Sequence, residues 1–243
     1  MSSFTHLHTH SHYSLLQALP KIPDLIKFAK DKGMTALALT DAGNLYGAIE
    51  FYKECKKKEI KPILGVDFYV ATRTRHDREP RIDNRRTRLI LLAKNHEGYK
   101  QLIKLVTTSY LDGFYYKPRI DKELIEQHKD NLLCIIPSFS GDLAQLIKGK
   151  NYEPTKELAE WYKKTFPDSV YLEITHHPEM DGHEATKLIR QNPQFQELPI
   201  IAMTDMSMLN SIKVRIAPMP ADGRPEMMVI GWMKLSYRMP STR

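Results

Sequence analysis

The sequence has little cysteine and no long apolar run. Its two cysteines, Cys55 and Cys134, are far apart and have no metal-binding or redox spacing, which argues against a disulfide framework and favours a reducing compartment. The longest apolar stretches, at 89–93 and 132–136, reach about a quarter of a membrane span, and the first ten residues contain no apolar signal core. We therefore predict a cytoplasmic protein that does not enter a membrane.

The chain also lacks a strong excess of one charge over most of its length. Its 243 residues are 42% apolar and 27% charged, which is enough to bury one sizeable core in one domain. The formal net charge is +7, but residues 211–243 hold six Lys or Arg and two Asp or Glu, and so carry four of those charges. The remaining body is only mildly basic, and its charge gives weak support for a polyanionic partner.

A glycine-rich dinucleotide fingerprint is absent, whereas strand and helix patterns alternate along the chain. Residues 22–29 show helical spacing of apolar residues, with Pro23 near the start and Gly33 beyond the end. This alternation predicts a parallel sheet closed into a barrel, with functional groups at the carboxyl ends of its strands. About seven strands are expected, at Thr5–His8, Ala36–Thr40, Ile63–Val70, Leu89–Ala93, Leu132–Ile136, Val170–Ile174 and Ile200–Met203.

One segment between two predicted strands, residues 73–88, contains seven arginines and no apolar periodicity. We interpret it as a solvated loop. An alternative is an arm that contacts phosphate, because arginine pairs with phosphate through two parallel bonds. The absence of an aromatic residue among these arginines weakens the case for single-strand binding. The candidate nucleic-acid contacts are Arg73, Arg75, Arg78, Arg81, Arg85 and Arg86.

Four histidines alternate near the amino terminus, at His6, His8, His10 and His12. On a strand, this spacing would place all four imidazoles on one face. Such a row can be solvated or satisfied by hydrogen bonds, but histidine is also a frequent ligand of transition metals. A metal site at the end of the first strand is the sharper hypothesis.

Several longer motifs, in the order in which they occur, resemble the PHP (polymerase and histidinol phosphatase) domain of the bacterial DNA polymerase III alpha subunit. They cover Phe4 to about Asn210 and read HLHTHSHYSLL, LALTDAGNLYGAIEFYKE, KPILGVDFYVATR, LILLAKNHEGYKQLIKL and GFYYKPRID. The resemblance implies an α/β fold, a distorted seven-stranded (β/α) barrel of the PHP type. It also implies that active members hold a cluster of metal ions and hydrolyse phosphoesters, in some polymerases as a 3′–5′ exonuclease.

Carried over by position, the resemblance makes His8, His10 and Asp205 metal ligands, with Asp67 standing where a glutamate is common. Three family histidines are replaced, by Ala42, Arg88 and Ser207. Milder departures are Gln17 in place of an aspartate and Ser138 in place of a frequent cysteine. The ligand set is therefore eroded, and at most one Zn²⁺ or Mn²⁺ ion is expected at a residual site.

The resemblance thus implies an N-terminal fragment of a DNA-directed DNA polymerase, a nucleotidyltransferase of DNA replication. Its partners would be the remainder of the alpha subunit, other replisome subunits and DNA. No Asp-x-Asp pair occurs in the chain, so we expect no polymerase active site in it. A structural module with an eroded metal site is our main hypothesis. The alternatives are an active metal-dependent 3′–5′ exonuclease and a free-standing PHP phosphoesterase.

Beyond Asn210 both the resemblance and the periodicity end. Residues 211–243 contain four prolines and five methionines without a clear period, and the pattern assigns no helix or strand to them. We expect a PHP domain at 1–210 and, at 211–243, a tail that arose by a frame change or truncation.

Overall fold

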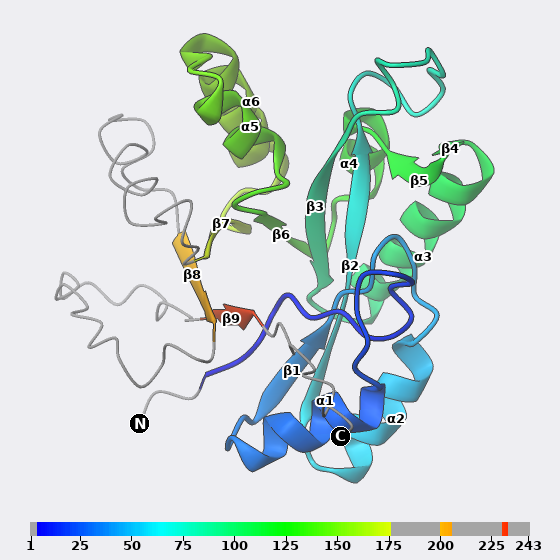
Figure 1. Ribbon diagram of the computed structural model, residues 1–243, viewed down its shortest axis with the longest axis vertical. Coiled ribbons are helices and arrows are strands. Elements are labelled where there is room, and N and C mark those ends of the chain that lie inside the picture. Colours follow the sequence, from blue (N-terminus) through cyan, green and yellow to red (C-terminus); the bar gives the residue numbers. More distant parts are fainter. Residues whose placement is uncertain (1–3, 176–199, 206–229, 233–243) are drawn as a thin grey trace, which may run out of the picture.

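The computed structural model describes residues 4–175, 200–205 and 230–232, and Figure 1 shows the arrangement of their helices and strands. In chain order these elements are α1 (Ile22–Asp31), β1 (Ala36–Leu39), α2 (Ala48–Lys57), β2 (Lys61–Ala71), β3 (Arg86–Ala93), α3 (His96–Leu111), β4 (Phe114–Tyr115), β5 (Lys117–Ile120), α4 (Lys122–His128), β6 (Leu132–Ile136), α5 (Asp142–Lys148), α6 (Tyr152–Thr165), β7 (Val170–Thr175), β8 (Ile200–Asp205) and β9 (Ile230–Trp232).

The helices begin and end where local chemistry favours it. In α1, Pro23 lies in the first turn, and the four apolar residues predicted to share one face are all buried. Gly33 follows the helix with φ +71°, a backbone conformation that glycine adopts without steric cost. The side chains of Asn95 and Asp121 accept bonds from the backbone N–H groups of Gly98 and Leu124, and so cap α3 and α4.

The sheet is mixed, and its strand order is β4-β5-β2-β3-β6-β7-β8-β9, with β1 beside β2. The prediction of a wholly parallel sheet was wrong, because β3 runs antiparallel to both β2 and β6. No helix lies between β2 and β3, so the chain returns through the 72–85 loop as a long hairpin. The sheet curls into a half barrel (Figure 1).

The core lies on both faces of this sheet. On β3, Leu89 and Leu91 are fully buried in the cluster that includes α3, α4 and α6, whereas Ile90 and Leu92 pack with Leu7 on the opposite face. Alternate residues of a strand point to opposite faces, so an apolar run such as 89–92 indicates a strand that is covered on both sides. A third cluster joins α1 and α2 to β1.

Two sequence-based expectations need correction at the ends of the chain. The predicted strand Thr5–His8 is not a strand, although its backbone runs beside β1 and the carbonyl of His6 accepts a bond from the N–H of Ala38 at 2.9 Å. In the tail, where no element was predicted, β9 pairs with β8 in parallel. No helix among the residues that the structure describes is long and apolar enough to cross a membrane.

Candidate metal centre

Backbone pairing with β1 brings the histidine segment to the carboxyl end of that strand. The N–H of Thr40 donates to the carbonyl of Thr9 at 2.8 Å, and the N–H of Thr9 donates to the hydroxyl of Thr40 at the same distance. These two hydrogen bonds hold the histidine segment in register with the end of β1, although the segment and β1 do not form a regular β-ladder. His8 and His10 flank Thr9, and this register therefore fixes their positions.

Asp41, immediately after β1, anchors the next turn of the same segment. Its carboxylate is 2% exposed and accepts bonds from the backbone N–H and the hydroxyl of Ser11, both at 2.7 Å, and from the hydroxyl of Ser14 at 2.6 Å. A buried carboxylate is stable when hydrogen bonds replace its lost hydration. Asp41 thus holds residues 11–14 against the end of β1, next to the histidines.

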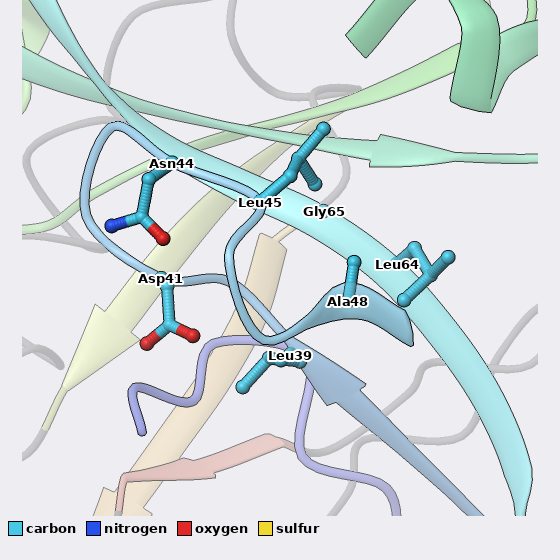
Figure 2. Close-up of a pocket in the computed structure, with 7 residues that line it drawn as sticks. All are labelled: Leu39, Asp41, Asn44, Leu45, Ala48, Leu64 and Gly65. Atoms are coloured by element: carbon cyan, nitrogen blue, oxygen red, sulfur yellow. The ribbon is translucent and has the colours of Figure 1, made fainter. Parts of the chain in front are cut away.

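The chain then turns over β2 and places Ala42 beside Asp67. Residues 42 and 67 form a parallel bridge, and the N–H of Gly43 donates to the carbonyl of Asp67 at 2.9 Å. Figure 2 shows the loop that carries Asp41 and Asn44 next to Gly65 of β2. A Cβ atom at Gly65 would lie 2.8 Å from the carbonyl oxygen of Leu91 on β3, so glycine at this position allows β2 and β3 to approach each other closely.

Three side chains converge at this edge of the sheet. The Nε2 atom of His10 lies 3.1 Å from Oδ2 of Asp67, and Nε2 of His8 lies 3.4 Å from the same oxygen. One ligand atom from each of the three residues falls within 4.8 Å of the others, a spacing at which they could hold a metal ion. Two imidazoles and a carboxylate are a frequent donor set for zinc.

Glu173 of β7 supports this group, although the sequence did not single it out. Its Oε1 lies 2.7 Å from Nδ1 of His8, and its Oε2 accepts a bond from the backbone N–H of Ser138 at 3.0 Å. A carboxylate on the far nitrogen of a histidine sets the tautomer and orientation of a ligating imidazole. The available signal was a single charged residue within the apolar strand predicted at 170–174.

Arg88 of β3 forms an ion pair with the carboxylate of Asp67. Its Nε donates to Oδ1 of Asp67 at 2.9 Å, and its Nη2 makes a second, short bond to Oδ2, the oxygen that faces the histidines. The Cζ atom of Arg88 also lies 4.1 Å from the centre of the Tyr69 ring, a cation–π distance. Gln17 donates to the hydroxyl of Tyr69 at 2.7 Å and holds that ring in place.

The electrostatics of the group follow from these contacts. Burial alone would raise the pKa of Asp67, but the guanidinium of Arg88, with His10 and His8, holds it well below its usual range. Burial alone would lower the pKa of His8, but the carboxylates of Glu173 and Asp67 raise it to about 10. His6 lies outside these pairs, and burial lowers its pKa to about 4. The positive charges of Arg88 and of protonated His8 thus balance the negative charges of the buried Asp67 and Glu173.

The remaining family positions divide into two kinds. Ala42, which the resemblance puts at a histidine position, lies beside Asp67 and offers no donor side chain. Asp205 is the last residue of β8, of which the structure describes the backbone alone, and Ser207 lies outside the described residues. The ring of His12 packs on Tyr13 at 4.3 Å, away from the alternating face expected of a strand.

The arginine loop is more ordered than a solvated arm. Arg73 pairs with Asp83 and Glu79, and Arg75 pairs with Asp121 and Glu123. Beneath them Arg119, which is fully buried, donates to four carbonyl oxygens at 2.9–3.0 Å, those of Arg75, Asp77, Asp83 and Gly113. Within the described residues, no ion pair involves the four remaining candidate contacts, which are Arg78, Arg81, Arg85 and Arg86.

The chain is similar to one protein family and to several curated proteins. The family model described as "PHP domain" matches residues 6–177. Three similar curated proteins are each named DNA polymerase III subunit alpha. The one from Borreliella burgdorferi is 41% identical over 210 residues, which are 86% of this chain and 18% of that protein. The one from Treponema pallidum is 38% identical over 206 residues, 84% of this chain and 18% of that protein.

The third, from Campylobacter jejuni, is 40% identical over 188 residues, 73% of this chain and 15% of that protein. The chain therefore spans less than a fifth of the length of these relatives. Among solved structures, an amidohydrolase from Chromobacterium violaceum, with bound sulfate and no metal, aligns with a TM-score of 0.49 at 11% identity. That alignment covers 83% of this chain and 86% of the other.

Proposed function

Since the chain belongs to the PHP domain family and is homologous to the N-terminal region of DNA polymerase III alpha subunits, we propose that it is a non-catalytic PHP module of a replicative polymerase. In this proposal the module orients and stabilises the polymerase that adjoins it. The curled sheet is the described part of a distorted seven-stranded barrel. Polymerase activity belongs to the remainder of the subunit, and the partners are that remainder, other replisome subunits and DNA, in the cytoplasm.

The observation that carries the proposal is the ion pair between Arg88 and Asp67. A divalent ion bound by Asp67 would lie close to this guanidinium, and at about 4 Å their repulsion is about 8 kcal/mol for an effective dielectric constant near 20. Such a repulsion exceeds what one additional ligand contributes. The guanidinium already gives the carboxylate the positive partner that a metal would provide.

Residual binding of one ion is compatible with this arrangement. His8, His10 and Asp67 are three ligands, enough for an open zinc or manganese site once Arg88 moves away. Asp205 ends β8 and is the proposed fourth ligand from the family pattern. A single weakly held ion is not the metal cluster that activates water for phosphoester hydrolysis in active members.

The first test compares the metal content of the wild-type protein with that of Arg88→His and Arg88→Gln. After dialysis against Zn²⁺ or Mn²⁺, we expect at most one ion per wild-type chain, held weakly. Arg88→His removes the cation and supplies an imidazole, so it should bind at least tenfold more tightly. Arg88→Gln is the matched control, because it removes the charge without adding a strong ligand. Two or more tightly held ions in the wild-type protein would contradict the proposal.

The second test addresses the enzymatic alternatives directly. The wild-type protein is incubated with a labelled 3′-recessed primer and, separately, with p-nitrophenyl phosphate, in Mn²⁺ or Zn²⁺. We expect no cleavage of either substrate. Primer degradation abolished by His8→Ala would identify an active 3′–5′ exonuclease, and hydrolysis of the small ester alone, also abolished by His8→Ala, would identify a free-standing phosphoesterase.

A further inference from the structure

A second set of charged residues lies on the same sheet, outside the His8–His10–Asp67 group. Tyr69 of β2 lies between two strands, opposite Arg88 on β3 and opposite Arg119 on β5. Residues that are directly opposite in a ladder share a face, and so do residues two apart on one strand. Arg86 and Lys117 are each two positions from these partners, so the register gathers four cations around one tyrosine.

Three of the four cations lie close to the Tyr69 ring, whereas the Cζ atom of Arg119 lies over the ring of Tyr115, at 5.2 Å. Besides Arg88, the Cζ atom of Arg86 lies 5.7 Å from the centre of the Tyr69 ring, and the Nζ atom of Lys117 lies 5.8 Å from it. Tyr69 is 6% exposed, so its ring is a wall on which the cations rest and is not itself available for stacking. The open side of the group is formed by Arg86 and Lys117, which are both partly exposed.

Two of the four charges in the group, those of Arg86 and Lys117, have no ion-pair partner among the described residues. Arg88 is neutralised by Asp67, and buried Arg119 is solvated by backbone carbonyls. Among the described residues, neither Arg86 nor Lys117 forms an ion pair, and the one hydrogen bond that Arg86 makes as donor is to the carbonyl of Asn84. The pKa of Arg119 is lowered by burial and by the nearby positive charges of Arg78 and Arg86. Like charges held this close are stabilised by an anion.

We propose that Arg86 and Lys117, resting on Tyr69, form a binding site for a phosphate group. A tetrahedral phosphate has enough acceptor oxygens for a guanidinium and an ammonium at once, and arginine matches its geometry. Tyr116, 68% exposed, directly precedes Lys117 in the sequence, and its ring packs on that of Tyr115 with the centroids 4.6 Å apart. The partner that we propose is a phosphate of a nucleotide strand, whose bases stack on exposed rings of this kind. The site is independent of the metal group and does not depend on whether that group is catalytic.

The test uses the protein as it is and two probes, inorganic phosphate and a labelled oligothymidylate of about 12 nucleotides. Binding of the oligonucleotide is measured by fluorescence anisotropy over a series of salt concentrations. Arg86→Gln and Lys117→Gln should each weaken binding about threefold to tenfold and reduce the salt slope by about 0.7, the value for one phosphate contact on a single strand. Both side chains are partly exposed, and a thermal melt checks that the variants fold.

Arg85→Gln is the matched control, because it removes the same charge one residue away, outside the strand face. An equal loss in Arg85→Gln would show that net charge alone drives binding, and would overturn the site. So would unchanged affinity in the Arg86→Gln/Lys117→Gln double variant. If inorganic phosphate at millimolar concentration displaces the oligonucleotide from the wild-type protein, the phosphate group alone is recognised. If it does not, while the two variants still weaken binding, the site requires the continuous strand.

Discussion

Arg88 of β3 reaches diagonally to Asp67 of β2, two residues from its ladder partner Tyr69, and the two are joined by two bonds, with Nε 2.9 Å from Oδ1 and a short contact between Nη2 and Oδ2. The oxygen bound by Nη2 is also the one nearest the two histidines. A cation supplied by the chain therefore already pairs with the carboxylate that His8 and His10 approach.

Removing the charge of Asp67 should destabilise the protein strongly. Asp67→Asn leaves Arg88 buried without a carboxylate and weakens the contacts to both histidines, so we expect the free energy of unfolding to fall by about 3 kcal/mol. Urea denaturation measures this change. The control is Asp31→Asn, which breaks the exposed pair with Lys27 and should cost far less, because solvent screens exposed ion pairs. Similar losses of unfolding free energy in the two variants would mean that the buried Arg88–Asp67 pair stabilises the protein no more than the exposed pair does.

The order of the 72–85 loop should depend on Arg119. Arg119→Met removes the donor to four carbonyl oxygens from three different parts of the chain, so we expect a loss of about 3–5 kcal/mol in unfolding free energy. Hydrogen exchange should accelerate at the amides of residues 75–83. Arg81→Met, at an exposed arginine of the same loop, is the control and should leave both quantities unchanged. Unaltered exchange in Arg119→Met would refute this role.

Both cysteines should be unreactive while the protein is folded. Cys55 and Cys134 are fully buried, and burial raises the pKa of Cys55 to about 12 and that of Cys134 well above its usual value. The pKa of Cys55 is higher in the folded protein than in the unfolded chain, so folding favours the neutral thiol. The stabilisation from this thiol is complete below about pH 9 and declines as the pH rises toward 12. Titration with a thiol reagent at pH 8 should detect neither thiol before denaturant is added, and both afterwards. Rapid labelling of one thiol would indicate local opening around it.

The origin of residues 211–243 stays a prediction. The relatives from Borreliella burgdorferi and Treponema pallidum match 86% and 84% of the chain. Within the tail β9 pairs with β8, so a chain ending at Asn210 loses that pairing. We still expect a protease to remove the tail readily and truncation at Asn210 to change the unfolding free energy little, because β9 is a three-residue strand at the edge of the sheet. Resistance of the tail to protease, or a large loss of stability on truncation, would contradict this. Nucleotide sequence around codon 210 tests the frame change itself.

Much of the candidate site was predictable because its ligands lie in short motifs. The alternate spacing of His8 and His10 indicated a metal site, and the resemblance to the PHP domain pointed to Asp67 and to Arg88, which stands where the family has a histidine. Glu173 was missed, since nothing local to β7 indicates that its carboxylate meets His8, 165 residues away. The expectation for Thr5–His8 failed for a related reason. Alternation predicts an extended chain, but regular ladder pairing depends on a partner strand.

The sequence by itself determined the family, the helix α1 with Pro23 near its start and Gly33 beyond its end, and buried strands such as that at 89–93. These features depend on local periodicity and on residue chemistry, which a single chain displays directly. The tertiary structure alone decided that β3 is antiparallel, that Arg73 and Arg75 pair internally while Arg119 orders their loop, and that Arg86 and Lys117 meet at Tyr69. Such contacts join residues that are distant in sequence, and strand register, which no local pattern encodes, determines which of them meet.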